Sequence, residues 1–146
     1  MHNLLHTIRR VLALTLFVSL ASLVSAAPTS AVLTFTSAGI SGTFGIKLDP
    51  LNQSLVEVTS VSLVIDGYKF KNKDLVFAYD PILDENSIGG VVNGLGSVNG
   101  SSGPDFLFHW SPAHVGGILT YVAPDHVTVV QTPADLTITQ KKGSGK

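Results

Sequence analysis

Apolar residues recur at every second position through most of this chain, a period that is typical of β-strands with one buried face. Leu33 and Phe35 alternate with threonines, and Phe44, Ile46 and Leu48 repeat the same spacing. After the first 26 residues, no i, i+3, i+4 pattern runs for three helical turns. Crossover helices are therefore missing, and parallel βαβ architecture is excluded. The pattern predicts an all-β fold, either an antiparallel β-sandwich or a jelly-roll-like barrel.

Turn residues divide the alternating segments into strands. Gly39 separates the first two, and Asp66-Gly67 favours the type I′ turn of a hairpin. The alternation changes phase near Thr59-Ser60, which predicts a bulge. The glycine- and asparagine-rich stretch 82–104 predicts a short strand followed by a long surface loop. Further strands are expected at 75–79, 105–110, 118–122, 127–131 and 136–139.

The amino-terminal segment has the features of a secretory signal peptide. Arg9 and Arg10 precede the apolar residues 11–24, and Val24-Ser25-Ala26 offers a small-residue cleavage site. The apolar run is shorter than the roughly twenty residues of a membrane-spanning helix, and no charged stop follows it. We therefore expect the protein to be secreted or periplasmic, with membrane contact only through an uncleaved leader.

This interpretation divides the chain into three parts. They are a cleaved helical signal peptide over 1–26, a single β-domain over 27–140 and a disordered tail over 141–146. The tail is expected to be disordered because it has nothing apolar to pack.

The charge and the cysteine count exclude several classes of function. Removal of Arg9 and Arg10 leaves 9 − 2 = 7 basic residues against 10 acidic ones, a formal charge of −3. Nucleic acid is therefore not expected as a partner, since it would need a basic face. The chain contains no cysteine, which excludes disulfides and thiolate metal sites. Packing alone must stabilise the domain.

The candidate ligand-binding residues are Trp110, His109 and Tyr121. Trp110 is the only tryptophan, and these three side chains could stack against and hydrogen-bond a sugar. The alternative is that Trp110 belongs to the core, because it shares one face at period two with Phe106 and Phe108. We predict no metal site at the three histidines of the mature chain. No catalytic residue is assigned, because the sequence contains no Gly-x-Ser-x-Gly elbow.

An acidic cluster offers a candidate site for Ca²⁺ and for no other cofactor. Asp80, Asp84, Glu85 and Asn86 place four oxygen-bearing side chains within seven positions of a predicted turn. Their spacing does not match an EF-hand. The alternative is ordinary turn chemistry, in which Asp and Asn side chains bind their own backbone. Two N-glycosylation sequons, at Asn52 and Asn99, also lie in predicted loops.

Several short motifs resemble those of a family of exported bacterial proteins. They are the strand Gly42-Thr43-Phe44-Gly45-Ile46, the turn Leu48-Asp49-Pro50, the loop Ile88-Gly89-Gly90-Val91-Val92-Asn93-Gly94, and the strand Asp105-Phe106-Leu107-Phe108-His109-Trp110. In these motifs the predicted β-domain is similar to proteins of the PEP-CTERM group. The Val-Pro-Glu-Pro motif, transmembrane stretch and arginine cluster that define that group's sorting tail are absent from this sequence. The resemblance implies a place in a biofilm or exopolysaccharide matrix and no particular reaction.

Together these features predict a secreted, non-enzymatic β-domain of the extracellular matrix or cell surface. Its expected partners are extracellular polysaccharide or matrix proteins. The alternative is a small secreted hydrolase or a lectin-like sugar-binding protein that uses Trp110 and His109.

Overall fold

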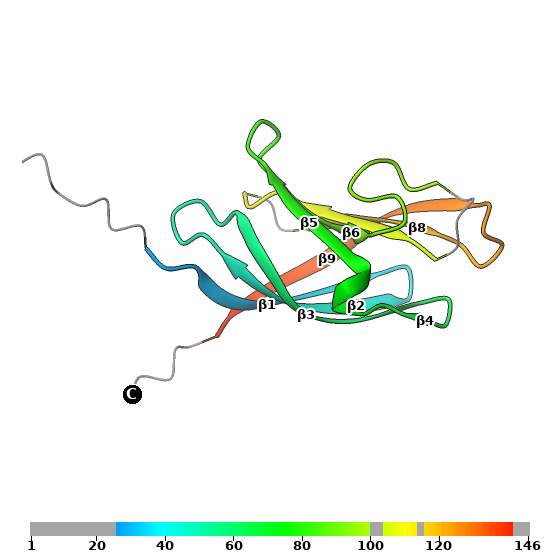
Figure 1. The fold of residues 1–146 in the computed structure, drawn as a ribbon, viewed down its shortest axis with the longest axis horizontal. Coiled ribbons are helices and arrows are strands. Elements are labelled where there is room, and N and C mark those ends of the chain that lie inside the picture. Colours follow the sequence, from blue (N-terminus) through cyan, green and yellow to red (C-terminus); the bar gives the residue numbers. More distant parts are fainter. Residues whose placement is uncertain (1–25, 100–103, 114–115, 142–146) are drawn as a thin grey trace, which may run out of the picture.

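The computed structural model describes residues 26–99, 104–113 and 116–141 of the 146-residue chain (Figure 1). The predicted signal peptide lies outside the described residues except for Ala26, and so does the predicted tail except for Lys141. The Lys141 N–H donates a hydrogen bond to the Ser30 carbonyl at 2.9 Å. Within the described ranges, no helix has the length and apolar character needed to cross a membrane.

The described chain folds into nine β-strands and one 3₁₀ turn. They are β1 (Thr29–Ser37), β2 (Ile40–Leu48), β3 (Leu55–Ile65), β4 (Tyr68–Lys69), η1 (Asn72–Asp74), β5 (Leu75–Asp80), β6 (Glu85–Gly90), β7 (Phe106–Trp110), β8 (Gly117–Val122) and β9 (Val129–Gln140).

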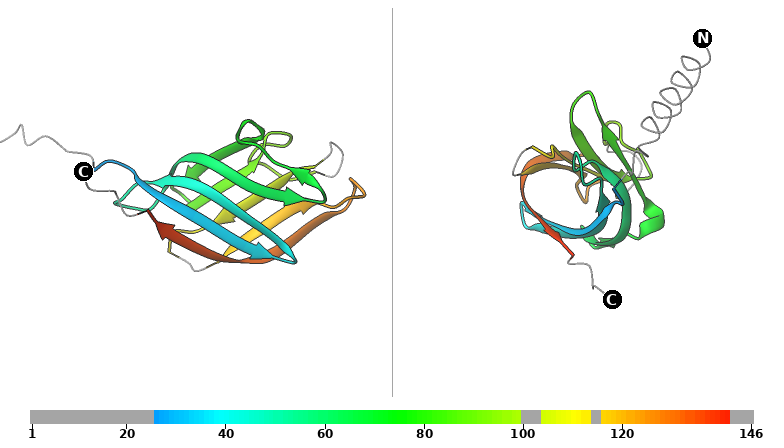
Figure 2. Two further views of the ribbon diagram at one scale, coloured as in Figure 1. Left: turned by 90° about the horizontal axis from the view of Figure 1, so that it is seen from below. Right: turned by 90° about the vertical axis from the view of Figure 1, so that its left-hand side faces the viewer.

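All nine strands form one antiparallel sheet in the order β4-β3-β2-β1-β9-β8-β7-β6-β5. Strands that are neighbours in sequence pair with each other, and β1 pairs with β9 to join the two ends of the chain. Figure 2 shows the sheet curled on itself into a half-barrel. The prediction of an all-β antiparallel fold is confirmed. The described residues form neither the two facing sheets of a sandwich nor a jelly roll, because one continuous sheet curls to bury its own inner face.

The sheet is left open between β3 and β5. Their Cα atoms come within 8 Å of each other, but no ladder joins them. Every ladder is antiparallel, so β4 and β5, at the two ends of the strand order, run in the same direction. Between them, η1 carries the chain from β4, which pairs with β3, to β5, which pairs with β6. We call the space between β3 and β5 the seam. Near η1, the Asn72 side chain crosses it by donating to the Thr59 carbonyl at 2.9 Å.

Aromatic rings fill the inside of the curled sheet. The centroids of Phe35 on β1 and Phe108 on β7 are 4.6 Å apart, although β9 and β8 separate these strands in the sheet. Phe70, just after β4, packs edge-on against Phe106 at 4.8 Å. All four side chains are buried. The inner face thus packs against itself across the half-barrel, and alternate residues of each strand supply this core.

The turn and the bulge that the sequence predicts are both present. Asp66 and Gly67 have φ of 52° and 82°, and they connect β3 to β4 in a hairpin. Between β2 and β3, Gly45 pairs with Ser60 and the next β2 residue pairs with Val58, so Thr59 is the extra residue of a bulge. The bulge restores the inward orientation of the apolar residues on both sides of the phase change.

One expected break is absent. Residues 129–131 and the segment 136–139 belong to a single strand, β9, although Pro133 lies within it, and residues 127 and 128 precede that strand. Up to Ala134, β9 pairs with β8, and from Asp135 onward it pairs with β1. Pro133 therefore lies where only one neighbour is paired, so the N–H that it lacks is not needed on the β1 side.

Candidate functional site

A pocket of about 660 Å³ lies at the end of the half-barrel where β1 and β7 end and where β6 and β8 begin. Its polar wall includes side chains from four strands and one loop, namely Ser37, Glu85, His109, Ser111 and Asp135. The apolar part of the wall includes Trp110, Ile118 and Pro133. A volume of this size with a few convergent polar groups suits a small organic ligand or part of a polymer.

Glu85 and His109 lie close together in this pocket. Ser87 on β6 pairs with His109 on β7, so Glu85, two residues before Ser87, lies on the same outer face of the sheet. Glu85 Oε1 is 3.2 Å from His109 Nδ1. His109 Nε2 is buried and has no hydrogen-bond partner among the described residues.

Trp110 and Tyr121 occupy different places from His109. Trp110 points to the inner face, is only 3 % exposed, and stacks on Phe108 with centroids 5.5 Å apart. Its alternative interpretation as a core residue is therefore confirmed, although it also lines part of the pocket. Tyr121 pairs with Phe106 on the same inner face and packs partly buried against the core. The structure thus brings His109 and Trp110 to one pocket and leaves Tyr121 out of its lining.

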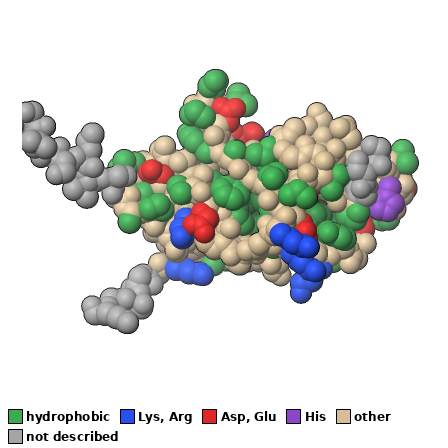
Figure 3. Space-filling model, in the orientation of Figure 1, with side chains coloured by type: hydrophobic (Ala, Val, Ile, Leu, Met, Phe, Trp, Pro, Cys, Tyr) green, Lys and Arg blue, Asp and Glu red, His purple; other side chains and the backbone are tan. Residues whose placement is uncertain are grey.

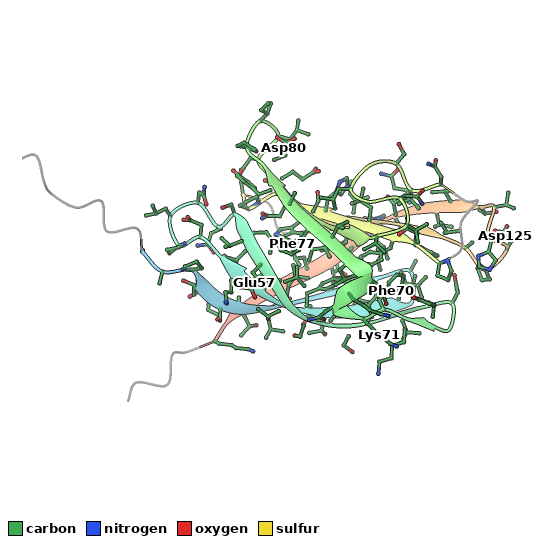
Figure 4. All side chains as sticks on the ribbon, viewed as in Figure 1. Glu57, Phe70, Lys71, Phe77, Asp80 and Asp125 are labelled. Carbon is green, nitrogen blue, oxygen red and sulfur yellow. The ribbon has the colours of Figure 1, made fainter. Side chains whose placement is uncertain are left out.

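The four candidate Ca²⁺ ligands do not converge on one point. Asp80, at the tip of the β5–β6 hairpin (Figure 4), accepts hydrogen bonds from the Ile82 and Leu83 N–H groups at 2.8 and 3.2 Å. Asp84 has φ of 50° and accepts the Tyr79 hydroxyl proton at 2.8 Å. This hydrogen bond is the main reason that the pKa of the Tyr79 phenol is raised above its ordinary value. Both carboxylates therefore have partners within the turn.

The other two candidates point elsewhere. Glu85 faces His109, and Asn86 is fully buried on the inner face. Asn86 Oδ1 accepts the Leu55 N–H at 2.6 Å, and its Nδ2 donates to the Gln53 carbonyl at 3.2 Å. In the described part of the chain, no group of three or more His, Asp or Glu side chains is placed to hold a metal ion.

Asp105 is a buried carboxylate that sequence reasoning did not single out. It is 1 % exposed, and its Oδ2 accepts the Asn93 backbone N–H at 3.1 Å and the Asn93 side-chain amide at 2.6 Å. Its Oδ1 has no partner among the described residues. Asp105 thus holds the beginning of the glycine-rich loop to the start of β7. The alternation placed Asp105 at the start of the expected strand 105–110 and gave no signal of this role.

No protein-family model, curated protein or solved structure matches this chain. The resemblance to the PEP-CTERM group therefore stays a prediction from short sequence motifs.

Proposed function

We propose that this protein is a secreted or periplasmic, non-enzymatic β-domain of the cell surface or extracellular matrix that binds a neutral polysaccharide. The pocket between Glu85, His109 and Asp135 is the observation that carries this proposal. The resemblance to the PEP-CTERM group supports the same setting. Matrix proteins are a further class of partner in that setting.

The pocket chemistry favours a ligand rich in hydroxyl groups. Glu85 and Asp135 offer carboxylate acceptors, and Ser111 offers a hydroxyl. No lysine or arginine is among the described residues that line the pocket, so an anionic polymer would meet like charge without compensation. A neutral sugar could hydrogen-bond to the carboxylates while its apolar face packs against Ile118 and Pro133.

Trp110 contributes packing to this site and no open stacking surface, because its ring is almost fully covered. Trp110→Ala would remove a large core side chain, at a cost of about 3–5 kcal/mol in the free energy of unfolding. Loss of sugar binding in that variant would not separate a ligand contact from a folding defect. Polar pocket residues are the better probes.

The proposal is tested by measuring the binding of the purified protein to an array of neutral and anionic glycans. Glu85→Gln and Asp135→Asn each remove one pocket carboxylate charge with little change in shape. We expect both variants to weaken the binding of a neutral glycan by about tenfold, which corresponds to one lost hydrogen bond to a charged group.

Asp66→Asn is the matched control. It removes a carboxylate from the β3–β4 turn, where φ is 52° and asparagine is well tolerated. This variant should bind like the unchanged protein. The proposal is wrong if no neutral glycan binds, or if the pocket variants and the control bind equally well.

A small hydrolase is a second candidate, favoured by the Glu85–His109 pair. A carboxylate that orients an imidazole leaves its other nitrogen available as a base. Ser111 lines the same pocket, but its Oγ accepts the Ala113 N–H at 3.2 Å, and no hydrogen bond joins it to His109. Ester or glycoside hydrolysis that is abolished by His109→Gln and by Ser111→Ala would favour this candidate over a binding domain.

A further inference from the structure

Two smaller pockets adjoin the candidate site on the outer face of the sheet. One of them, of about 250 Å³, shares Ile118 and Pro133 with the candidate site. The other, of about 460 Å³, shares Glu85 with it. Because neighbouring pockets have wall residues in common, a ligand in the candidate site can continue into either of them. We call the three pockets together the outer groove, and the candidate site its central pocket.

One row of paired residues runs beneath the whole outer groove. Each residue pairs with the next across five adjacent strands, from β5 to β9, in the order Ala78, Ser87, His109, Ile118 and Pro133. Every one of them lines at least one of the three pockets, and none of them is buried. Residues that pair across strands present their side chains on the same face of a sheet. The row is therefore the floor of the outer groove, and four strand spacings give it a length of about 19 Å.

Two loops form the walls of the outer groove at its β5 end. Leu83 belongs to the tip of the β5–β6 hairpin and is 68 % exposed, and Figure 3 shows hydrophobic side chains gathered at this tip. Leu95 belongs to the glycine-rich loop that follows β6. A Cβ atom at Gly89 would lie 2.8 Å from the Gly94 carbonyl oxygen and 3.3 Å from Leu95 Cδ2. Gly89 therefore leaves room for this loop to fold back onto β6 and to form one wall of the groove.

The outer groove is apolar at both ends and polar in the middle. Ala78 and Leu83 lie at one end, and Ile118 and Pro133 lie at the other. Polar side chains lie between these ends, namely Glu85, Ser87 and His109. No lysine or arginine is among the described residues that line any of the three pockets. Each ring of a neutral glycan offers an apolar face and several hydroxyl groups, so a chain of such rings matches this order of surfaces.

We propose that the outer groove binds a linear neutral glycan over several consecutive sugar rings, which lie across the strands along the row from Ala78 to Pro133. This inference rests on the proposed function, which concerns the central pocket alone. A short oligomer in the central pocket reaches few of the apolar contacts at the two ends of the row. A longer oligomer gains those contacts, so its affinity is higher until the chain covers the row and constant beyond that length.

The experiment is isothermal titration calorimetry of the purified protein with oligomers of the neutral glycan that binds most tightly on the array. The oligomers range from about two to about eight sugar rings. We expect the affinity to rise by about tenfold or more from the shortest oligomer to the longest, and to level off once the row is covered.

A leucine in the wall of the groove and a leucine outside it form a matched pair of variants. Leu83→Ser removes an apolar wall at the β5 end and should lower the affinity for the longest oligomer by about tenfold. Leu51→Ser changes a leucine of the β2–β3 loop that is 84 % exposed and lines none of the three pockets. This control should leave the affinity unchanged. Asp135→Asn, in the central pocket, should weaken the binding of short and long oligomers alike.

Nuclear magnetic resonance gives a readout that needs no variant. The amide signals of Ala78 and Ser87 should shift on addition of the longest oligomer and much less on addition of the shortest. The inference is overturned, and the proposed function stands, if oligomers of every length bind equally tightly and Asp135→Asn weakens them all. Equal effects of the two leucine variants, or unshifted Ala78 and Ser87 signals with the longest oligomer, also overturn it. If no neutral oligomer binds, the proposed function fails and this inference fails with it.

Discussion

Buried polar side chains link segments of this protein that are distant in sequence. Ser37, Asn86 and Asp105 are at most 3 % exposed, and each forms hydrogen bonds with the backbone of a segment distant in sequence. Ser37, for example, donates to the Pro133 carbonyl at 2.7 Å. A buried polar group that loses its partner costs more free energy than the hydrogen bond gains. These three residues therefore fix where their neighbouring segments lie.

Gly90 is required by the position of Asp105. A Cβ atom at residue 90 would overlap Asp105 Oδ1, and that carboxylate is held by Asn93. We expect Gly90→Ala to lower the free energy of unfolding by about 1–3 kcal/mol, through overpacking. Gly96→Ala is the control, because its Cβ would have only the Asn93 carbonyl oxygen near it, at 3.8 Å. Equal melting temperatures for the two variants would contradict this explanation.

The Asp125 carboxylate makes the stability of the fold depend on pH in the acidic range. It accepts the Thr128 hydroxyl proton and also the Thr128 and Val127 N–H groups, and these bonds, the hydroxyl first, hold its pKa below the ordinary 3.8. A group whose pKa is lower in the folded state stabilises the fold above its unfolded-state pKa. That stabilisation is lost as the pH falls through the folded-state pKa.

The corresponding measurement is thermal melting of the protein and of Thr128→Val from pH 7 down to pH 2. Thr128→Val removes the largest contribution to the lowered pKa. It should melt lower than the unchanged protein at pH 7, and the difference should shrink as the pH falls below the ordinary 3.8 of an aspartate and through the lower folded-state pKa. A difference that stays constant over the whole range would show that Asp125 ionisation is not its cause.

At the scale of the elements, side chains replace the missing ladder at the seam. Asn72 joins η1 to β3 at one end, and Asn86 joins β6 to the start of β3 at the other. The bond between Asn86 and the Leu55 N–H is buried, whereas that of Asn72 is exposed to water. Because water can replace a partner only at an exposed site, the two residues should differ in their importance to the fold.

Asn86→Ala is expected to lower the free energy of unfolding by about 1–3 kcal/mol, because the buried Leu55 N–H loses its acceptor. Asn72→Ala should cost about 1 kcal/mol or less. Urea denaturation measures both values. The exchange rate of the Leu55 amide gives a local check, since it should rise in Asn86→Ala and not in Asn72→Ala. Equal losses of stability would mean that the seam is held mainly by packing of the apolar side chains.

At the scale of the whole molecule, β1 lies in the middle of the sheet and β5 at one end of it. β1 pairs with β2 along its full length and with β9 over residues 31–36, and Leu33 and Phe35 on it are fully buried. β5 has one paired neighbour and a half-exposed aromatic residue. Stability measured by exchange is rarely uniform across a structure, and it is highest where burial and pairing are both complete.

We expect amide hydrogen exchange in a dilute sample to be slowest in β1 and fastest in β5. Because one core spans the half-barrel, thermal unfolding should be a single transition, with equal calorimetric and van't Hoff enthalpies. Slower exchange in β5 than in β1, or two separate transitions, would contradict a single sheet that buries its own inner face.

The sequence alone predicted the local structure of this protein well. The period-two pattern indicated the strands, Asp66-Gly67 indicated a hairpin, and the phase change near Thr59-Ser60 indicated a bulge. These features depend on side chains that are adjacent in the chain, so a linear sequence contains them. Composition likewise excluded disulfides, because the chain contains no cysteine.

The sequence also placed His109 and Trp110 among the candidate binding residues, and both line the pocket. It did not pair Glu85 with His109, because these residues meet only through the β6–β7 register. It grouped Asn86 with Glu85 as ligands of one ion, yet the pleat turns neighbouring side chains to opposite faces. Asn86 accordingly points into the core, away from Glu85.

The arrangement of the strands was decided by tertiary structure alone. Alternation shows that each strand buries one face, but a second sheet and the curled remainder of the same sheet can cover that face equally well. The choice depends on contacts such as that of Phe35 with Phe108 and on the pairing of β1 with β9, which join residues far apart in the chain. The same closure leaves the seam between β3 and β5 without a ladder and places the pocket where four strands end or begin.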